Sequence, residues 1–184
     1  VLDFKQLTYK SADADEKELP IIPGTSWAGA FRYHIMELLK DKAFVDEYFG
    51  ICDTAVQGKN KRRKKSKILF SESIINGDHM TSKVMTRNAI DRFTGGTIDG
   101  ALFTEKTFFG GETDLTIVLQ AGEDEKFYKA LIYSIADLNE GFLAVGGMTS
   151  VGRGLFKISR INDTEISGAS DILKFAEKEK QANG

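Results

Sequence analysis

Two amphipathic helical patterns, one near each end of a strand-rich stretch, restrict this chain to a mixed α+β fold. In the first, Trp27, Phe31 and Ile35, followed by Leu38 and Leu39, recur at helical spacing after the turn at Pro23 and Gly24. Either Thr25 or Ser26 is suited to cap that helix, because a hydroxyl oxygen accepts a hydrogen bond from a free backbone N–H.

The second pattern covers residues 123–141, where Leu131, Ile135 and Leu138 line one face and Gly141 suits the C-terminal cap. A short helix is expected over 42–50 and a C-terminal helix with a polar tail over 168–184.

Strand signals lie around and between these helices. We expect strands at 67–75, 113–120 and 154–161, and a long hairpin inserted at 82–112, where strand-forming residues are interrupted by glycine pairs. This order favours an α+β domain with helices on one face of an antiparallel sheet, and the ferredoxin-like unit is the nearest standard arrangement. Its first strand either precedes Val1 or is formed by "VLDFKQL".

Length and composition indicate one domain over 1–184 that needs no disulfide. The chain has 184 residues, 41% of them hydrophobic, and its one cysteine is Cys52. No signal peptide or long apolar run is found, so we expect a cytoplasmic protein without a membrane partner.

The basic charge is concentrated in one place. The run "KNKRRKKSK" at 59–67 holds seven of the 25 Lys and Arg residues, leaving 18 basic against 27 acidic residues elsewhere. We expect a basic loop over 53–66, either in contact with nucleic acid or simply solvated.

The stretch "VGGMTSVGRGLFKI" at 145–158 contains four glycines and leads into a strand pattern. It is neither a nucleoside-triphosphate loop nor a dinucleotide fingerprint, because no Gly-Lys-Ser/Thr ends it and no helix follows. Consecutive N–H groups and Arg153 remain able to hold a phosphate, and a tight helix-to-strand bend is the alternative.

Catalytic motifs are sparse. His34 lies beside an apolar helix stripe, His79 lies in a polar loop, and there is no paired-cysteine or HExxH metal motif. In the 82–112 region, Arg87, Arg92 and Lys106 alternate with phenylalanines, a pattern suited to holding phosphates and stacking bases, although an ordinary hairpin with buried phenylalanines has it too.

Three blocks together resemble the RAMP superfamily of CRISPR systems. They are "IIPGTSWAGAFR", "NAIDRFTGGTIDGALFTEKTFFGG" and "VGGMTSVGRGLFKI", which occur in the family's order between residues 21 and 158. The resemblance is greatest to backbone subunits of type III effector complexes, and it implies an RNA-recognition-motif-like fold with a thumb-like hairpin that interrupts guide–target pairing.

The resemblance also implies partners and site residues: guide RNA, target RNA and other RAMP-type subunits. The residues expected to bind RNA, with the basic run included, are Arg32, Lys61, Arg62, Arg63, Lys64, Arg87, Arg92, Gly146, Gly147, Gly152, Arg153 and Gly154.

Backbone subunits of this type often cut target RNA through an aspartate upstream of the proline-glycine element. Asp3 is the counterpart here, although the proline of the family's pattern is missing and the intervening loop is longer. The implied activity is a metal-dependent endoribonuclease, with Mg²⁺ as the hard cation that carboxylate oxygens prefer.

Two other functions stay open from the sequence. One is a guide-precursor-processing endoribonuclease of the same superfamily, in which His34 or His79 would act. The other is a protein-interaction domain that binds no RNA.

Overall fold

The computed structural model describes residues 4–10, 18–52, 63–120 and 124–183. The chain divides into two compact units, and each is described by itself. The hairpin unit comprises residues 1–23 and 72–115, and the helical unit comprises residues 24–71 and 116–184.

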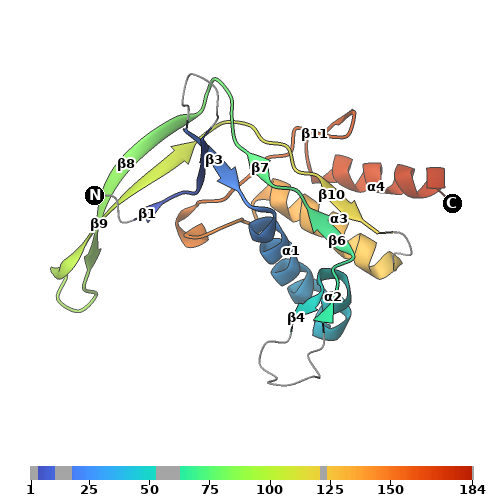
Figure 1. Ribbon diagram of the computed structural model, residues 1–184, viewed down its shortest axis with the longest axis horizontal. Helices are drawn as coiled ribbons and strands as arrows, with labels where there is room; N and C mark the ends of the chain where they lie inside the picture. The colour runs from blue at the N-terminus through green and yellow to red at the C-terminus, as the bar shows by residue number, and fades with distance from the viewer. Residues whose placement is uncertain (1–3, 11–17, 53–62, 121–123, 184) are drawn as a thin grey trace. The chain divides into compact units, whose positions relative to one another are not determined.

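Two small sheets form the described part of the hairpin unit. Its strands are β1 (Phe4–Lys5), β2 (Thr8–Lys10), β3 (Glu18–Ile22), β7 (Ser73–Ile74), β8 (Thr81–Ile90) and β9 (Thr97–Phe109). One sheet has the order β1-β9-β8, with β8 antiparallel and the short β1 parallel to β9. The other is antiparallel with the order β2-β3-β7. The expected hairpin is therefore present as β8 and β9, and "VLDFKQL" supplies β1 (Figure 1).

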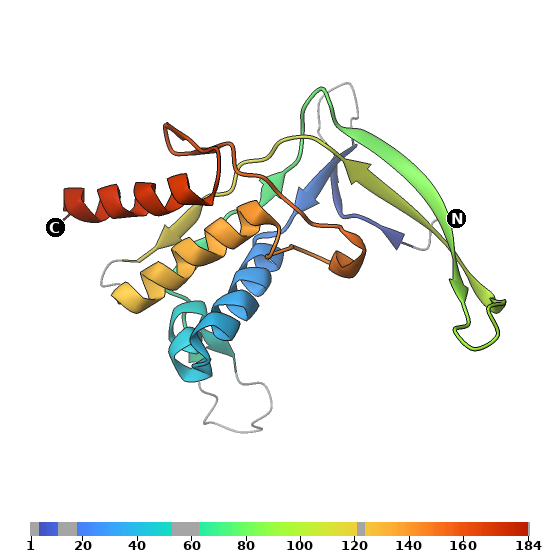
Figure 2. The ribbon, with the colours of Figure 1, turned by 180° about the vertical axis from the view of Figure 1, so that it is seen from behind.

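Helices dominate the helical unit. They are α1 (Gly24–Leu39), α2 (Lys42–Phe49), α3 (Glu125–Glu140), the 3-10 turn η1 (Thr149–Val151) and α4 (Ala169–Asn183). Three two-stranded antiparallel pairs accompany them: β4 (Ile51–Cys52) with β5 (Arg63–Lys64), β6 (Ile68–Phe70) with β10 (Ile117–Leu119), and β11 (Arg160–Ile161) with β12 (Thr164–Glu165). Figures 1 and 2 show α1 and α3 together on one face of the β6–β10 pair.

The expected apolar stripes form the core of this unit. Trp27, Phe31 and Ile35 of α1 are almost completely buried, as are Phe127 and Leu131 of α3. Leu38, by contrast, is 45% exposed, so the buried stripe of α1 stops one turn before the helix ends. The Phe31 ring lies 5.2 Å from the Phe70 ring of β6, which joins the helix layer to the strands.

Local chemistry explains where the helices begin and end. Lys40 has a left-handed backbone (φ 52°) that ends α1, and the Asp41 carboxylate accepts from the Phe44 N–H to start α2. Gly141 caps α3 in the left-handed conformation, as expected. Because α1 begins at Gly24, Thr25 and Ser26 lie inside its first turn.

The strand expected at 67–75 is divided between two sheets. Phe70 ends β6, and β7 begins at Ser73 in the hairpin unit. The Ser71 N–H donates to the Thr116 carbonyl, and the Thr116 N–H donates to the Ser71 hydroxyl oxygen, each at 2.9 Å. This reciprocal pair holds together the two residues that flank the 72–115 stretch.

Two further expectations are corrected. The strand expected at 154–161 is confined to Arg160 and Ile161, because the Ile158 N–H donates to the Asn139 side chain instead of to a neighbouring strand. The loop expected over 53–66 contains β5 at residues 63 and 64. Among the described residues, no helix is both long enough and apolar enough to span a membrane.

Candidate nucleic-acid interface

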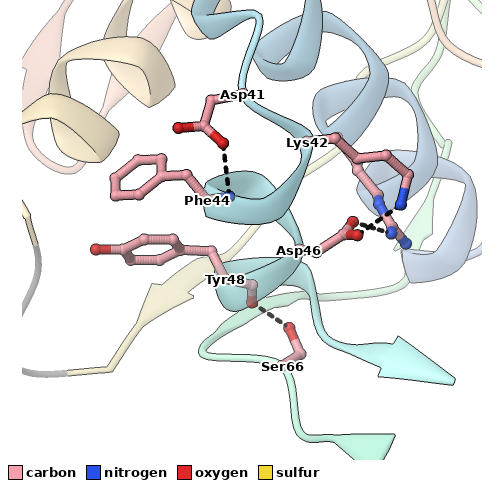
Figure 3. A network of polar contacts seen from close by, with 7 residues as sticks. Asp41, Lys42, Phe44, Asp46, Tyr48 and Ser66 are labelled. Carbon is pink, nitrogen blue, oxygen red and sulfur yellow. Dashed lines mark hydrogen bonds and ion pairs between the residues drawn. The ribbon is translucent and has the colours of Figure 1, made fainter. Parts of the chain in front are cut away.

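Arg32 of α1 faces α2, where it shares a carboxylate with a second cation. Asp46 accepts from the Arg32 guanidinium through one oxygen. It accepts from Lys42 Nζ, at 2.7 Å, through the other (Figure 3). The Asp46 side chain is only 8% exposed, whereas Arg32 is 40% and Lys42 73% exposed. A buried carboxylate thus holds two solvent-accessible cations from two helices.

Hydrogen bonds from these cations stabilise the charged form of Asp46. The bond from Lys42, followed by that from Arg32, holds the pKa of the Asp46 carboxyl below its ordinary value of 3.8, although burial alone would raise it. Asp46 is therefore ionised at neutral pH.

The next part of α2 orients the end of the basic run. Lys64 Nζ lies 2.8 Å from Glu47 Oε1, and Lys67 Nζ lies 4.9 Å above the Tyr48 ring. The Ser66 hydroxyl donates to the Tyr48 carbonyl at 2.9 Å (Figure 3). Lys61 and Arg62 lie outside the described residues, and Arg63 is described only as part of β5.

The glycine-rich loop is closed at its base by Val145 and Gly154. The Val145 N–H donates to the Gly154 carbonyl at 2.9 Å, and a Cβ at Gly154 would lie 2.0 Å from the Val145 oxygen. Gly154 also has a φ of +71°, so glycine is required there by both space and conformation. This residue therefore closes the loop, but the expected helix-to-strand bend is not formed, because the next strand begins only at Arg160.

The rest of the loop is open to solvent. Gly146, Gly147 and Gly152 are exposed, and a Cβ at any of them would meet no atom within 4 Å. The Arg153 guanidinium contacts Met148 Sδ at 3.8 Å. After the loop, the Phe156 ring packs 5.1 Å from the Trp27 ring, which anchors this segment to α1.

In the hairpin unit, Arg87 is committed to a buried ion pair. Its Nε lies 2.6 Å from Oε1 of Glu105, which is 1% exposed. Lys106, the next residue on β9, lies 3.3 Å from Glu18 Oε2, and the Thr8 hydroxyl donates to Glu18 Oε1 at 2.9 Å. These contacts fasten β9 to β8 and to the β2–β3 strands, so Arg87 has a structural task as well as its predicted RNA contact.

The hairpin tip is organised by Asp91. One carboxylate oxygen accepts from the Phe93 N–H and the other from the Thr94 hydroxyl, both at 2.9 Å. Gly95 N–H donates to the Asp91 carbonyl and Asp91 N–H to the Gly96 carbonyl, which closes the turn. The Phe93 N–H, with the Thr94 hydroxyl, keeps the pKa of the Asp91 carboxyl below its ordinary value. The turn presents Phe93 fully exposed, beside an exposed Arg92.

The two histidines have different surroundings. His34 Nε2 lies 2.7 Å from Asp137 Oδ2, which ties α1 to α3, and the His34 side chain is 18% exposed. His79 is exposed in the hairpin unit. Asp3 lies outside the described residues, and no group of three or more potential metal ligands occurs in the described ranges.

Sequence reasoning missed three residues that organise the candidate sites: Lys42 and Asp46 in the helical unit and Asp91 in the hairpin unit. A signal for the first two exists, because Lys42 and Asp46 are four residues apart on a short helix and so lie on one face. For Asp91 the signal is the order of residues in the turn. An aspartate side chain can accept hydrogen bonds from groups two and three residues later, here Phe93 and Thr94, and two glycines follow them.

The fold is thus α+β and ferredoxin-like, as expected, with cationic groups in both units. A comparison with known protein families matches residues 6–157 to the RAMP superfamily. This match covers most of the chain, and the chain belongs to the RAMP superfamily.

A chain from the cryo-EM structure of the type III-B Cmr-beta bound to cognate target RNA has a similar fold. The TM-score is 0.53 and the sequence identity 17%, and the alignment covers 78% of this chain and 46% of that chain. The present chain therefore spans less than half of that neighbour. No curated protein sequence matches the chain.

Proposed function

We propose that this chain is an RNA-binding subunit of a type III RNA-guided complex, in which it binds guide RNA and lies against target RNA and other RAMP-type subunits. Family membership supports this role, as does the fold shared with a chain from a Cmr structure that contains target RNA. The observation that carries the proposal is the ordered tip that holds Phe93 fully exposed beside Arg92.

A fully exposed phenylalanine is costly in water and useful against a nucleobase. Bases stack on aromatic rings whatever their sequence, and an adjacent arginine suits the backbone phosphate. Because three hydrogen bonds fix the turn through Asp91 and Thr94, the backbone that carries the ring loses little freedom on binding.

The test measures binding of a fluorescently labelled single-stranded RNA by anisotropy at several salt concentrations. Phe93→Ala should weaken binding by about 1–3 kcal/mol, the usual contribution of one stacked base. Tyr133→Ala is the control, because Tyr133 is an exposed aromatic residue on α3, a helix that supplies none of the proposed RNA-binding residues. Equal affinity of Phe93→Ala and the unchanged protein would argue against the tip as an RNA contact.

The class of RNA is tested by purifying the protein from its native host and sequencing what copurifies. Repeat-derived guides are expected. If only unrelated RNA or none is recovered, the interaction-domain alternative is favoured.

Target cleavage through Asp3 is a separate part of the proposal, supported by the position of this aspartate upstream of the proline-glycine element. Asp3→Ala should abolish Mg²⁺-dependent cutting of target RNA and leave guide binding intact. Cutting that persists in this variant and is lost in His34→Ala or His79→Ala would instead favour a processing-type nuclease.

A further inference from the structure

The contact between α1 and α2 contains more cationic charge than its structural role needs. Asp46 carries one negative charge, and Arg32 and Lys42 together carry two positive charges. In the part of the chain that the structure describes, Asp46 is the one carboxylate that either cation contacts. A single formal positive charge is therefore left over at the surface.

The donors of both cations are only partly used. A guanidinium has five N–H donors and an ammonium has three, and the described contacts use one donor of each. Both side chains are well exposed, so the remaining donors are accessible to a ligand.

We propose that Arg32 and Lys42, held side by side by Asp46, form a binding site for one phosphodiester group of the RNA, with Asp46 as the positioning residue. The ligand's single negative charge matches the excess charge of the cluster. A planar guanidinium fork and a compact ammonium bind phosphate oxygens well when both are already oriented. This inference rests on the proposed RNA-binding function and assigns a particular site to it.

Asp46→Asn distinguishes two explanations of RNA binding at this site, because an effect of net charge alone and an effect of positioning by Asp46 change the affinity in opposite directions. Asp46→Asn removes a negative charge beside two cations, so attraction to RNA should increase if only charge matters. If Asp46 positions the cations, the same change should weaken binding by about tenfold, as expected when a charge-assisted contact is lost.

The experiment compares single-stranded RNA binding of the full chain with that of Asp46→Asn. The matched control is Glu37→Gln, which removes one negative charge from the exposed pair between Glu37 of α1 and Lys40, the residue that follows the helix. We expect weaker binding for Asp46→Asn and unchanged or slightly tighter binding for Glu37→Gln. Asp46→Asn binding as tightly as the unchanged chain, or more tightly, overturns the inference.

Two further variants keep the test decisive if Asp46→Asn does not fold. Lys42→Gln alters an exposed residue, and it should lower affinity and reduce the salt dependence by about 0.7 in log–log slope, the value for one phosphate contact on a single strand. Arg32→Lys keeps the charge but not the fork, and it should also weaken binding. Unchanged binding in both variants overturns the site.

Failure of this inference and failure of the proposed function are separable in the same titrations. If Phe93→Ala weakens RNA binding and the Arg32, Lys42 and Asp46 variants do not, the function stands without this site. If the unchanged chain binds no RNA even at low salt, both fail.

Discussion

Gly154 illustrates how much one residue can determine in this chain. Its left-handed backbone and its contact with the Val145 carbonyl leave no room for a side chain. A Cβ added at Gly146, Gly147 or Gly152 would meet nothing within 4 Å, so packing does not require glycine at these positions, although positive φ angles favour it at Gly146 and Gly152.

Substituting these glycines should therefore have unequal effects on stability. Gly154→Ala should lower the free energy of unfolding by at least about 1–3 kcal/mol, because it adds left-handed strain and a backbone clash. Gly147→Ala, whose φ is not positive, should stay within about 0.5 kcal/mol of the unchanged protein. Urea denaturation followed by circular dichroism measures both, and equal effects would show that the loop base is not as tight as described.

Asp46 should also give the helical unit a specific acid sensitivity. Its pKa in the folded state lies below the ordinary value of 3.8, so the ionised form stabilises the fold from neutral pH down to about 3.8. That stabilisation is lost as the pH falls from 3.8 through the lower folded-state pKa.

Unfolding free energies measured in urea across this acid range should show the effect. The unchanged protein should lose stability more steeply below pH 3.8 than Asp46→Asn, whose side chain does not titrate. Parallel curves for the two proteins would mean that the ion pairs with Arg32 and Lys42 contribute little to folding.

At the scale of elements, the hairpin tip depends on one side chain. Asp91→Ala removes the acceptors for the Phe93 N–H and the Thr94 hydroxyl, so the amides of residues 93–95 should exchange with solvent faster. The rest of β8 and β9 should keep its protection, because its ladder runs from Thr81 and Phe109 to Asn88 and Leu102. Hydrogen exchange measured by NMR tests this, and unchanged exchange at the tip would contradict the role of Asp91.

The same variant links order at the tip to RNA binding. Asp91→Ala removes a negative charge, which by itself favours RNA, yet it should weaken binding because Phe93 is no longer held in place. A gain in affinity would mean that the tip binds through charge and not through a presented ring.

Helices were easier to predict from the sequence than strands, and for local reasons. Trp27, Phe31 and Ile35 repeat at helical spacing and Gly141 ends α3, and these signals do not depend on distant residues. The segment after the glycine loop has the alternation of a strand, but Phe156 packs on Trp27 and Ile158 on the Ile166–Ile172 cluster. Phe156 and Ile158 thus pack against the helical unit's core and not in a sheet, a difference that the pattern alone cannot show.

The candidate RNA-binding residues were also predictable only in part, because the sequence shows the cations but not the groups that orient them. The sequence predicts Arg32 and Lys64 as RNA-binding cations, and the structure adds the carboxylates of Asp46 and Glu47 that orient them. Such partners depend on how α1, α2 and β5 pack, and packing is not visible in the spacing of one element.

At the scale of the whole molecule, RNA affinity should be strongly salt-dependent although the net charge is −2. The basic run is the reason, because released counterions depend on local contacts and not on the total charge. Replacing Lys61, Arg62, Arg63 and Lys64 by glutamine should lower affinity for all RNA sequences alike and reduce the log–log salt slope by about 0.7 for each lost contact. An unaltered slope would mean that the run is merely solvated.

The reciprocal hydrogen bonds between Ser71 and Thr116 act as a clasp across a gap of 44 residues in the chain. Because both bonds join only Ser71 and Thr116, they do not depend on the length of the segment between these residues. Insertions and deletions among relatives should therefore accumulate between these two residues. Such changes alter the length of the enclosed segment and leave the Ser71–Thr116 hydrogen bonds in place.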